Sequence, residues 1–168
     1  KTESLTYTNS HIPVSFSIFS NIPGYNIEPI HEVNENPKEL IKIFVLTLVK
    51  IAEVAYEQSQ IKYDKLLKAI DNKLNTIQDK KEKGKLLNLK KEFDKWLREV
   101  PTIGFNSAKY DCNIMKKYLY ETLNKYNNRD EDEKNDFIQV LKTGNSYRVF
   151  TSKNLKFLDI SNFLAAGT

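Results

Sequence analysis

The sequence predicts an α/β fold, and three observations predict it. Residues 12–18 alternate apolar and polar side chains, which is the pattern of a half-buried strand. Residues 37–55 repeat apolar side chains at three- and four-residue spacing, which is the pattern of one helical face. A short apolar run at 102–106 precedes renewed helical spacing from about residue 110. Strand and helix patterns therefore alternate along the chain.

The composition is that of a globular protein of one domain. The chain has 168 residues, of which 40% are hydrophobic and 29% are charged. Its single Cys, Cys112, excludes a disulfide framework and a Cys-based zinc site, and two His are too few for a His-rich metal centre. The longest apolar run, at 43–49, is far too short to span a bilayer, so we expect no membrane partner. No signal-peptide pattern opens the chain, and because it begins with Lys1 rather than Met we expect a piece of a longer protein.

The first third of the chain has clear element boundaries. Pro13 must lie at the start or on an edge of the strand at 12–18, because proline cannot donate to a ladder. Residues 21–24 predict a turn, and residues 25–33 predict a second, weaker strand. Asn36 then has the position of a helix cap, with Pro37 in the first turn.

A helical hairpin is expected at about 58–99. Helical spacing resumes at Tyr63, breaks near Gly84 and returns from Leu86 to Leu97. This stretch holds eight basic residues against four acids between Asp79 and Arg98, which is the whole net charge of +4. A solvated lysine-rich helix and a surface for phosphate backbones are both open interpretations.

The last third predicts a strand, a helix and two more strands. The run at 102–106 is typical of a buried inner strand, and a helix follows over 110–126. Residues 127–136 form a polar, acidic loop. Two strands at 146–150 and 155–160 flank a turn at 151–154.

The best candidate for a functional site in the sequence is the segment Gly104-Phe105-Asn106-Ser107-Ala108-Lys109-Tyr110-Asp111. The predicted strand places Asn106 at a sheet edge, and Asp111 lies near the start of the next helix. Its carboxylate is therefore expected at the carboxyl end of a strand, where α/β sheets build their sites. Two structural roles are open as well. From the residues alone the role of a cap at the helix N-terminus is favoured for Asp111, and Tyr110 also suits a core position at the junction.

This octapeptide resembles the second exonuclease motif of family B DNA polymerases. More closely, it is similar to DNA polymerase type B, organellar and viral, a branch that includes protein-primed replicases of viruses, linear plasmids and large self-replicating transposons. Three further segments resemble that branch in the right order: residues 11–16, 113–119 and 158–167. The resemblance covers most of the chain apart from about 58–99.

The resemblance implies a partial ribonuclease H-like mixed sheet with flanking helices and an inserted helical hairpin. Asp111 matches the catalytic metal-ligand position, while Asn106 and Tyr110 match positions that hold the single-stranded 3′ end of DNA, with Lys109 as a further DNA contact. The parent would be a DNA-directed DNA polymerase, a nucleotidyltransferase for DNA replication with 3′–5′ proofreading. It would use Mg²⁺ or Mn²⁺ and act inside the cell, in a compartment set by the host element. A priming terminal protein is a further implied partner.

The number of candidate metal-binding carboxylates, called the ligand count below, indicates that this chain alone is inactive. The family's acidic pair does not precede the strand at 12–18, and its third motif would lie beyond Thr168. One matched carboxylate, Asp111, cannot hold two hard cations, each of which takes several oxygen ligands. We therefore interpret residues 1–168 as a partial exonuclease domain with a helical insertion at about 58–99. The alternatives are a nucleic-acid-binding or protein-interaction module, and a ribonuclease H-like nuclease unrelated to polymerases.

Overall fold

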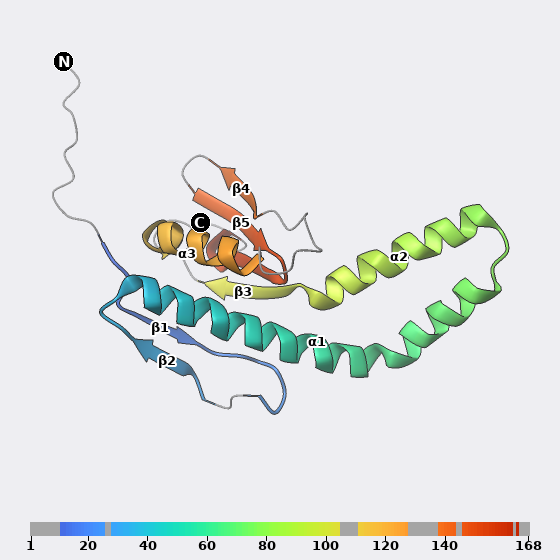
Figure 1. Cartoon of the computed structure of the whole chain (residues 1–168), viewed down its shortest axis with the longest axis horizontal. Coiled ribbons are helices and arrows are strands. Elements are labelled where there is room, and N and C mark those ends of the chain that lie inside the picture. Colours follow the sequence, from blue (N-terminus) through green and yellow to red (C-terminus); the bar gives the residue numbers. More distant parts are fainter. Residues whose placement is uncertain are drawn as a thin grey trace, which may run out of the picture.

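The structure is a computed structural model that describes residues 11–25, 28–104, 111–127, 138–143, 146–162 and 164. These residues form a mixed α/β arrangement, which confirms the predicted α/β class (Figure 1). The helices are α1 (Pro37–Thr76), α2 (Lys80–Arg98) and α3 (Asp111–Asn127), followed by a 3₁₀ turn at Ile160–Asn162. No helix in the described part of the chain is both long enough and apolar enough to cross a membrane.

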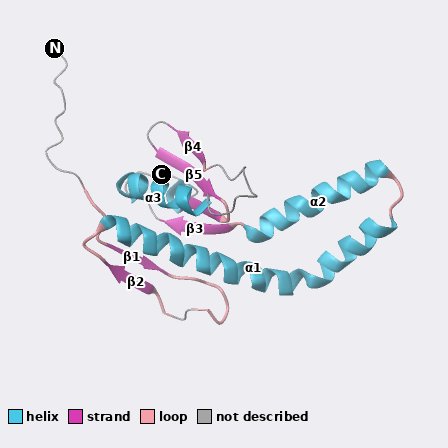
Figure 2. Ribbon diagram, in the orientation of Figure 1, coloured by secondary structure: helices cyan, strands magenta, loops and turns pink. Residues whose placement is uncertain are grey.

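The strands form two sheets (Figure 2). β1 (Ser15–Ile18) and β2 (Ile30–Val33) pair antiparallel in a two-stranded sheet. The second sheet has the order β3-β6-β5-β4, with the strands β3 (Val100–Gly104), β4 (Gln139–Thr143), β5 (Ser146–Ser152) and β6 (Leu155–Asp159). β3 and β6 are parallel and the other pairs are antiparallel, so this sheet is mixed.

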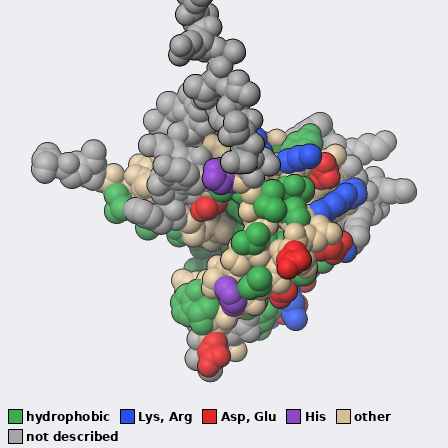
Figure 3. All heavy atoms as spheres, turned by 90° about the vertical axis from the view of Figure 1, so that its left-hand side faces the viewer, with side chains coloured by type: hydrophobic (Ala, Val, Ile, Leu, Met, Phe, Trp, Pro, Cys, Tyr) green, Lys and Arg blue, Asp and Glu red, His purple; other side chains and the backbone are tan. Residues whose placement is uncertain are grey.

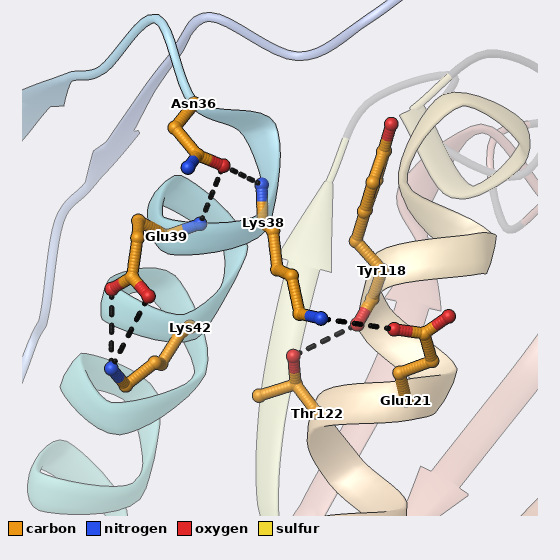
Figure 4. Close-up of polar contacts among 7 residues, drawn as sticks. All are labelled: Asn36, Lys38, Glu39, Lys42, Tyr118, Glu121 and Thr122. Carbon is orange, nitrogen blue, oxygen red and sulfur yellow. Dashed lines mark hydrogen bonds and ion pairs between the residues drawn. The ribbon is translucent and has the colours of Figure 1, made fainter.

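Helix α1 starts where the sequence predicts. The Asn36 side chain accepts hydrogen bonds from the backbone N–H groups of Lys38 and Glu39, at 3.0 and 3.4 Å (Figure 4). A cap of this kind stabilises a helix by about 1 kcal/mol. The Lys38 ammonium then reaches Glu121 of α3 at 3.9 Å, an exposed pair that links the two helices (Figure 4).

The core lies between these two helices and one face of the second sheet. Leu119 and Leu123 of α3 meet Phe150, Leu155 and Phe157 of the sheet. The α1 side chains of this core are Ile41, Phe44, Val45, Leu48 and Ala52. Burying each large apolar side chain contributes roughly 1.5–3 kcal/mol, so the apolar face of α1 holds the sheet and α3 together.

The helical hairpin projects from this core (Figure 1). Its first arm is the second half of α1, which continues unbroken past residue 58, and its second arm is α2. The predicted break near Gly84 is wrong: the turn lies at 77–79, and Gly84 is inside α2, where Asp79 caps the helix. A single glycine is tolerated in a helix at a cost of about 1 kcal/mol, whereas the carboxylate cap decides where the helix starts. No residue of 58–99 belongs to the main core cluster, so the hairpin packs chiefly on itself.

Several strand boundaries differ from the sequence-based expectation. β1 is shorter than 12–18, and Ile12 and Val14 lie outside it and are exposed. Pro13 precedes the strand, as its missing donor requires. β4 has no counterpart among the elements that the sequence predicts. Asn127, expected in the polar loop at 127–136, is the last residue of α3, while residues 128–136 of that loop and the end of the run at 102–106 lie outside the described residues.

The most informative difference concerns β3. The sequence predicts an inner strand, but β3 is at the edge of its sheet and pairs only with β6 among the described strands. Its Ile103 side chain is 60% exposed. β3 does not pair with β1 either, because the two strands belong to different sheets. Strand pairing is set by contacts between distant residues, which an apolar run does not specify.

Candidate functional site

The candidate site lies at the carboxyl ends of β3 and β6. These strands are parallel, and their register places Gly104 beside Asp159 at the end of both. Helix α3 then begins at Asp111. Asp111 and Asp159 both line a cavity of about 500 Å³ that lies along β3. The fold therefore brings two carboxylates from distant parts of the sequence to one site.

The two carboxylates differ in environment. Asp111 is exposed in the first turn of α3, where its charge suits the helix dipole. Asp159 is only 3% exposed because β6 alternates, and it shares the core side of the strand with Leu155 and Phe157. One oxygen, Oδ1, accepts hydrogen bonds from the Ser161 backbone N–H and hydroxyl, at 3.0 and 2.6 Å. These two bonds offset part of the cost of burying the charge.

The pKa of the Cys112 thiol is affected by both carboxylates. Burial, followed by the negative charges of Asp111 and then Asp159, raises the pKa of its thiol from 9.0 to about 11. The thiolate is therefore scarce at neutral pH, and Cys112 is not an activated nucleophile. This agrees with the sequence, which offers no His near it.

The cavity continues from the acidic end between the two sheets. Its lining includes every residue of β1 and of β3, with Phe44, Leu48 and Ile51 of α1 as an apolar side. Asp111 and Asp159 are the only charged residues among the described lining. Seen from the end of the molecule that carries β1 and β2, hydrophobic side chains reach the surface, while Lys and Arg lie mostly on one side (Figure 3).

The predicted DNA-contact residues lie outside the described residues. These are Asn106, Lys109 and Tyr110, so only Asp111 of the predicted site has a defined place. Sequence reasoning missed Asp159 as a site residue. A carboxylate at the end of a strand was a visible signal, but its parallel pairing with β3 was not.

The described residues do not by themselves make a metal site. No group of three or more His, Cys, Asp or Glu side chains among them could hold a metal ion. Asp111 and Asp159 provide two carboxylates, one of which already accepts two bonds through the same oxygen. A two-metal site takes more oxygen ligands than these.

Comparison with known proteins does not assign this chain to a family. No family model, no curated protein and no solved structure matches this chain. What the fold and the site define is a class: a mixed α/β protein with two carboxylates at the carboxyl edge of a parallel strand pair.

Proposed function

We propose that the chain is part of the 3′–5′ exonuclease domain of a protein-primed family B DNA polymerase, with a ribonuclease H-like fold. The proposal starts from the motif that ends in Asp111. The observation that carries it is the position of Asp111, which starts α3, the next described element after β3, and lines a cavity at the carboxyl edge of the sheet. Carboxylates at such edges are where α/β sheets build their sites.

In this proposal Asp111 is a metal ligand, and Asn106, Lys109 and Tyr110 hold the single-stranded 3′ end of DNA. An aromatic ring stacks on a base of any identity, while an amide and a lysine contact sugar and phosphate. The parent would use Mg²⁺ or Mn²⁺, with the remaining ligands supplied by segments outside the chain. The 168-residue chain alone is then expected to show neither polymerase nor exonuclease activity.

The test is a nucleotide-removal assay on a 5′-labelled single strand with Mg²⁺. We expect no trimming by residues 1–168, and trimming by a longer chain that restores the upstream acidic pair and the downstream Tyr-x-x-x-Asp. In the longer chain Asp111→Ala should abolish trimming and leave DNA binding nearly intact. Glu121→Ala, on the same helix but paired with Lys38, is the matched control and should remain active.

Two results would count against the proposal. Strong Mg²⁺-dependent trimming by the short chain would contradict the ligand count. Unchanged trimming by Asp111→Ala in the longer chain would refute the assignment of the motif.

A specific observation favours one second candidate, a nucleic-acid-binding module. Helix α2 exposes Lys80, Lys81, Lys91 and Lys95, and none of them forms an ion pair with a described residue. Trp96 on the same helix is 60% exposed and stacks on Phe93, with ring centroids 5.8 Å apart. Unpaired lysines along a helix that also carries an exposed aromatic ring suit a nucleic-acid strand.

A further inference from the structure

We propose that helix α2 binds the phosphate backbone of double-stranded DNA through a line of lysines on the side that faces away from α1. The partner is a B-form duplex, bound without regard to its sequence. This inference deepens the second candidate function and rests on it, and it is independent of the exonuclease proposal.

The lysines follow one line along α2, on which neighbouring positions are three or four residues apart. At 3.6 residues per turn, these positions fall within about 80° of the helix circumference. The line consists of Lys80, Gly84, Asn88, Lys91 and Lys95, and Lys81 adjoins it in the first turn. We call these residues the lysine stripe, and none of the acidic residues of α2 belongs to it.

The lysine stripe lies on the side of α2 opposite its contact with α1. The ring of Phe93 meets Tyr63 of α1, with centroids 5.6 Å apart, and Leu97, one turn further along the same side, is buried. Lys91 and Lys95 each lie two residues from Phe93, which places them about 200° around the helix from it. The stripe therefore faces outward along the projecting hairpin (Figure 1).

The charges of the stripe are not neutralised by the described part of the chain. Its four lysines are exposed and form no ion pair with a described residue. On α1, by contrast, Lys42 pairs with Glu39 at 3.1 Å, and Lys68 pairs with an acid of the same helix at 2.8 Å. Exposed, unpaired cations on one line attract a polyanion.

The position of these lysines weakens α2 as a helix. Lys80 and Lys81 lie in the first turn, where the positive end of the helix dipole repels cations. Lys91 and Lys95 are a like-charge pair four residues apart, which also destabilises a helix. Helix stability therefore does not account for the stripe, whereas binding of an anionic partner does.

The spacing of the lysines fits a DNA duplex. They form two groups, at 80–81 and 91–95, and the helix rises about 15 Å from Lys81 to Lys91. The stripe is uncharged between the groups, at Gly84 and Asn88. The major groove of B-form DNA is about 12 Å wide, so a helix laid across it reaches phosphates at both borders. The minor groove, about 6 Å wide, and the narrow major groove of an RNA duplex do not match this spacing.

A single strand fits the stripe less well than a duplex does. Sites for single strands combine cations with aromatic side chains on which the bases stack. The stripe contains no aromatic residue, and Trp96 lies about 100° around the helix from Lys95. The Trp96 ring stacks instead on Phe93, which contacts α1. Binding through phosphates alone favours the duplex, because its charge density is higher.

The test is fluorescence anisotropy with the full chain and a fluorescein-labelled DNA duplex of about 20 base pairs, which is roughly two helical turns. At about 50 mM salt we expect saturable binding that weakens steeply as salt is added. One strand of the same sequence, and an RNA duplex of the same length, should each bind roughly fivefold more weakly or worse. A DNA duplex of unrelated sequence should bind equally well, because phosphate contacts carry no sequence information.

Two double variants of α2 locate the contact. Lys81→Gln with Lys91→Gln removes one charge from each group of the stripe. It should weaken duplex binding roughly tenfold or more and lower the slope of log K against log salt by about 1.8, which is about 0.9 for each phosphate contact. Lys83→Gln with Lys85→Gln is the matched control, since both lysines are exposed on α2 outside the stripe. It should have a much smaller effect, and circular dichroism should show equal helicity in both variants.

The proposal fails if the duplex does not bind at low salt, if the RNA duplex binds as tightly, or if the control variant loses as much affinity as the stripe variant. Tighter binding of the single strand, lost in the stripe variant, would refute the duplex and leave the second candidate function in place. An absence of all nucleic-acid binding would refute both. None of these results bears on nucleotide removal, which the exonuclease proposal assigns to Asp111.

Discussion

Cys112 lies next to Asp111 at the start of α3, and its surroundings explain its chemistry. Burial and two nearby carboxylates favour the neutral thiol, and they raise its pKa from 9.0 to about 11. Because the folded chain holds the thiol proton more tightly than the unfolded chain, this group contributes stability below pH 9. That contribution declines as the pH rises from about 9 to about 11.

The reactivity of the thiol tests this account. The folded chain should react with a disulfide reagent at pH 8 about a hundredfold more slowly than the same chain unfolded in urea, because its thiolate is that much scarcer. Absorbance of the released thiolate follows the rate, and Cys112 is the only Cys in the chain. Equal rates in the folded and unfolded chain would contradict the raised pKa.

At the scale of elements, the hairpin of α1 and α2 is held by side chains of its own. Tyr63 meets Phe93 and Trp96 edge-on, with ring centroids 5.6 and 5.8 Å apart. Lys90 of α2 pairs with Asp71 of α1. Nearer the core, the Tyr56 hydroxyl donates to Asp94 at 3.0 Å, and burial followed by this bond raises the pKa of Tyr56. The hairpin is thus a self-contained arm with a lysine-rich outer surface.

The lysines of that surface carry the second candidate function. Replacing Lys80, Lys81, Lys91 and Lys95 by glutamine should flatten the salt dependence of binding to single-stranded DNA. Each phosphate contact that is lost lowers the slope of log K against log salt by about 0.7. Filter binding over a range of salt concentrations measures the slope.

The control for this experiment removes equal charge elsewhere. Lys50, Lys65, Lys73 and Lys125 are also exposed, and their replacement by glutamine should have a smaller effect on the slope. Equal slopes for the two variants would show that α2 has no special part in DNA binding.

At the scale of the whole molecule, the core and the hairpin are separate in their packing. The core cluster draws on α1 only as far as Ala52, on α3 and on the second sheet. β1 packs against this cluster through Phe16 and Ile18. The hairpin therefore adds little to the burial that holds the sheets in place.

Replacing residues 60–95 by a short Gly-Ser linker should leave one cooperative unfolding transition. The urea dependence of the unfolding free energy should fall, because less surface is exposed when the smaller chain unfolds. Urea titration followed by circular dichroism measures both. Loss of cooperative unfolding would show that the arm is part of the core.

Local signals in the sequence determined much of the fold. The Asn36 cap and the apolar spacing after it determined the start and the buried face of α1. Helical spacing likewise determined α3, and alternation or apolar runs placed β1, β3, β5 and β6 to within a few residues. These signals work because caps and periodicity act between residues close together in the chain.

Only the tertiary structure decided how these elements meet. It placed β3 at a sheet edge beside β6, left β1 with β2, and brought Asp159 to the cavity that Asp111 lines. Gly84 misled the prediction of the hairpin turn, because a glycine in a helix interior has only a modest cost. The physical reason is the same in each case. Strand pairing and the meeting of two carboxylates depend on packing between distant segments, and a run of residues specifies its own periodicity but not its neighbour.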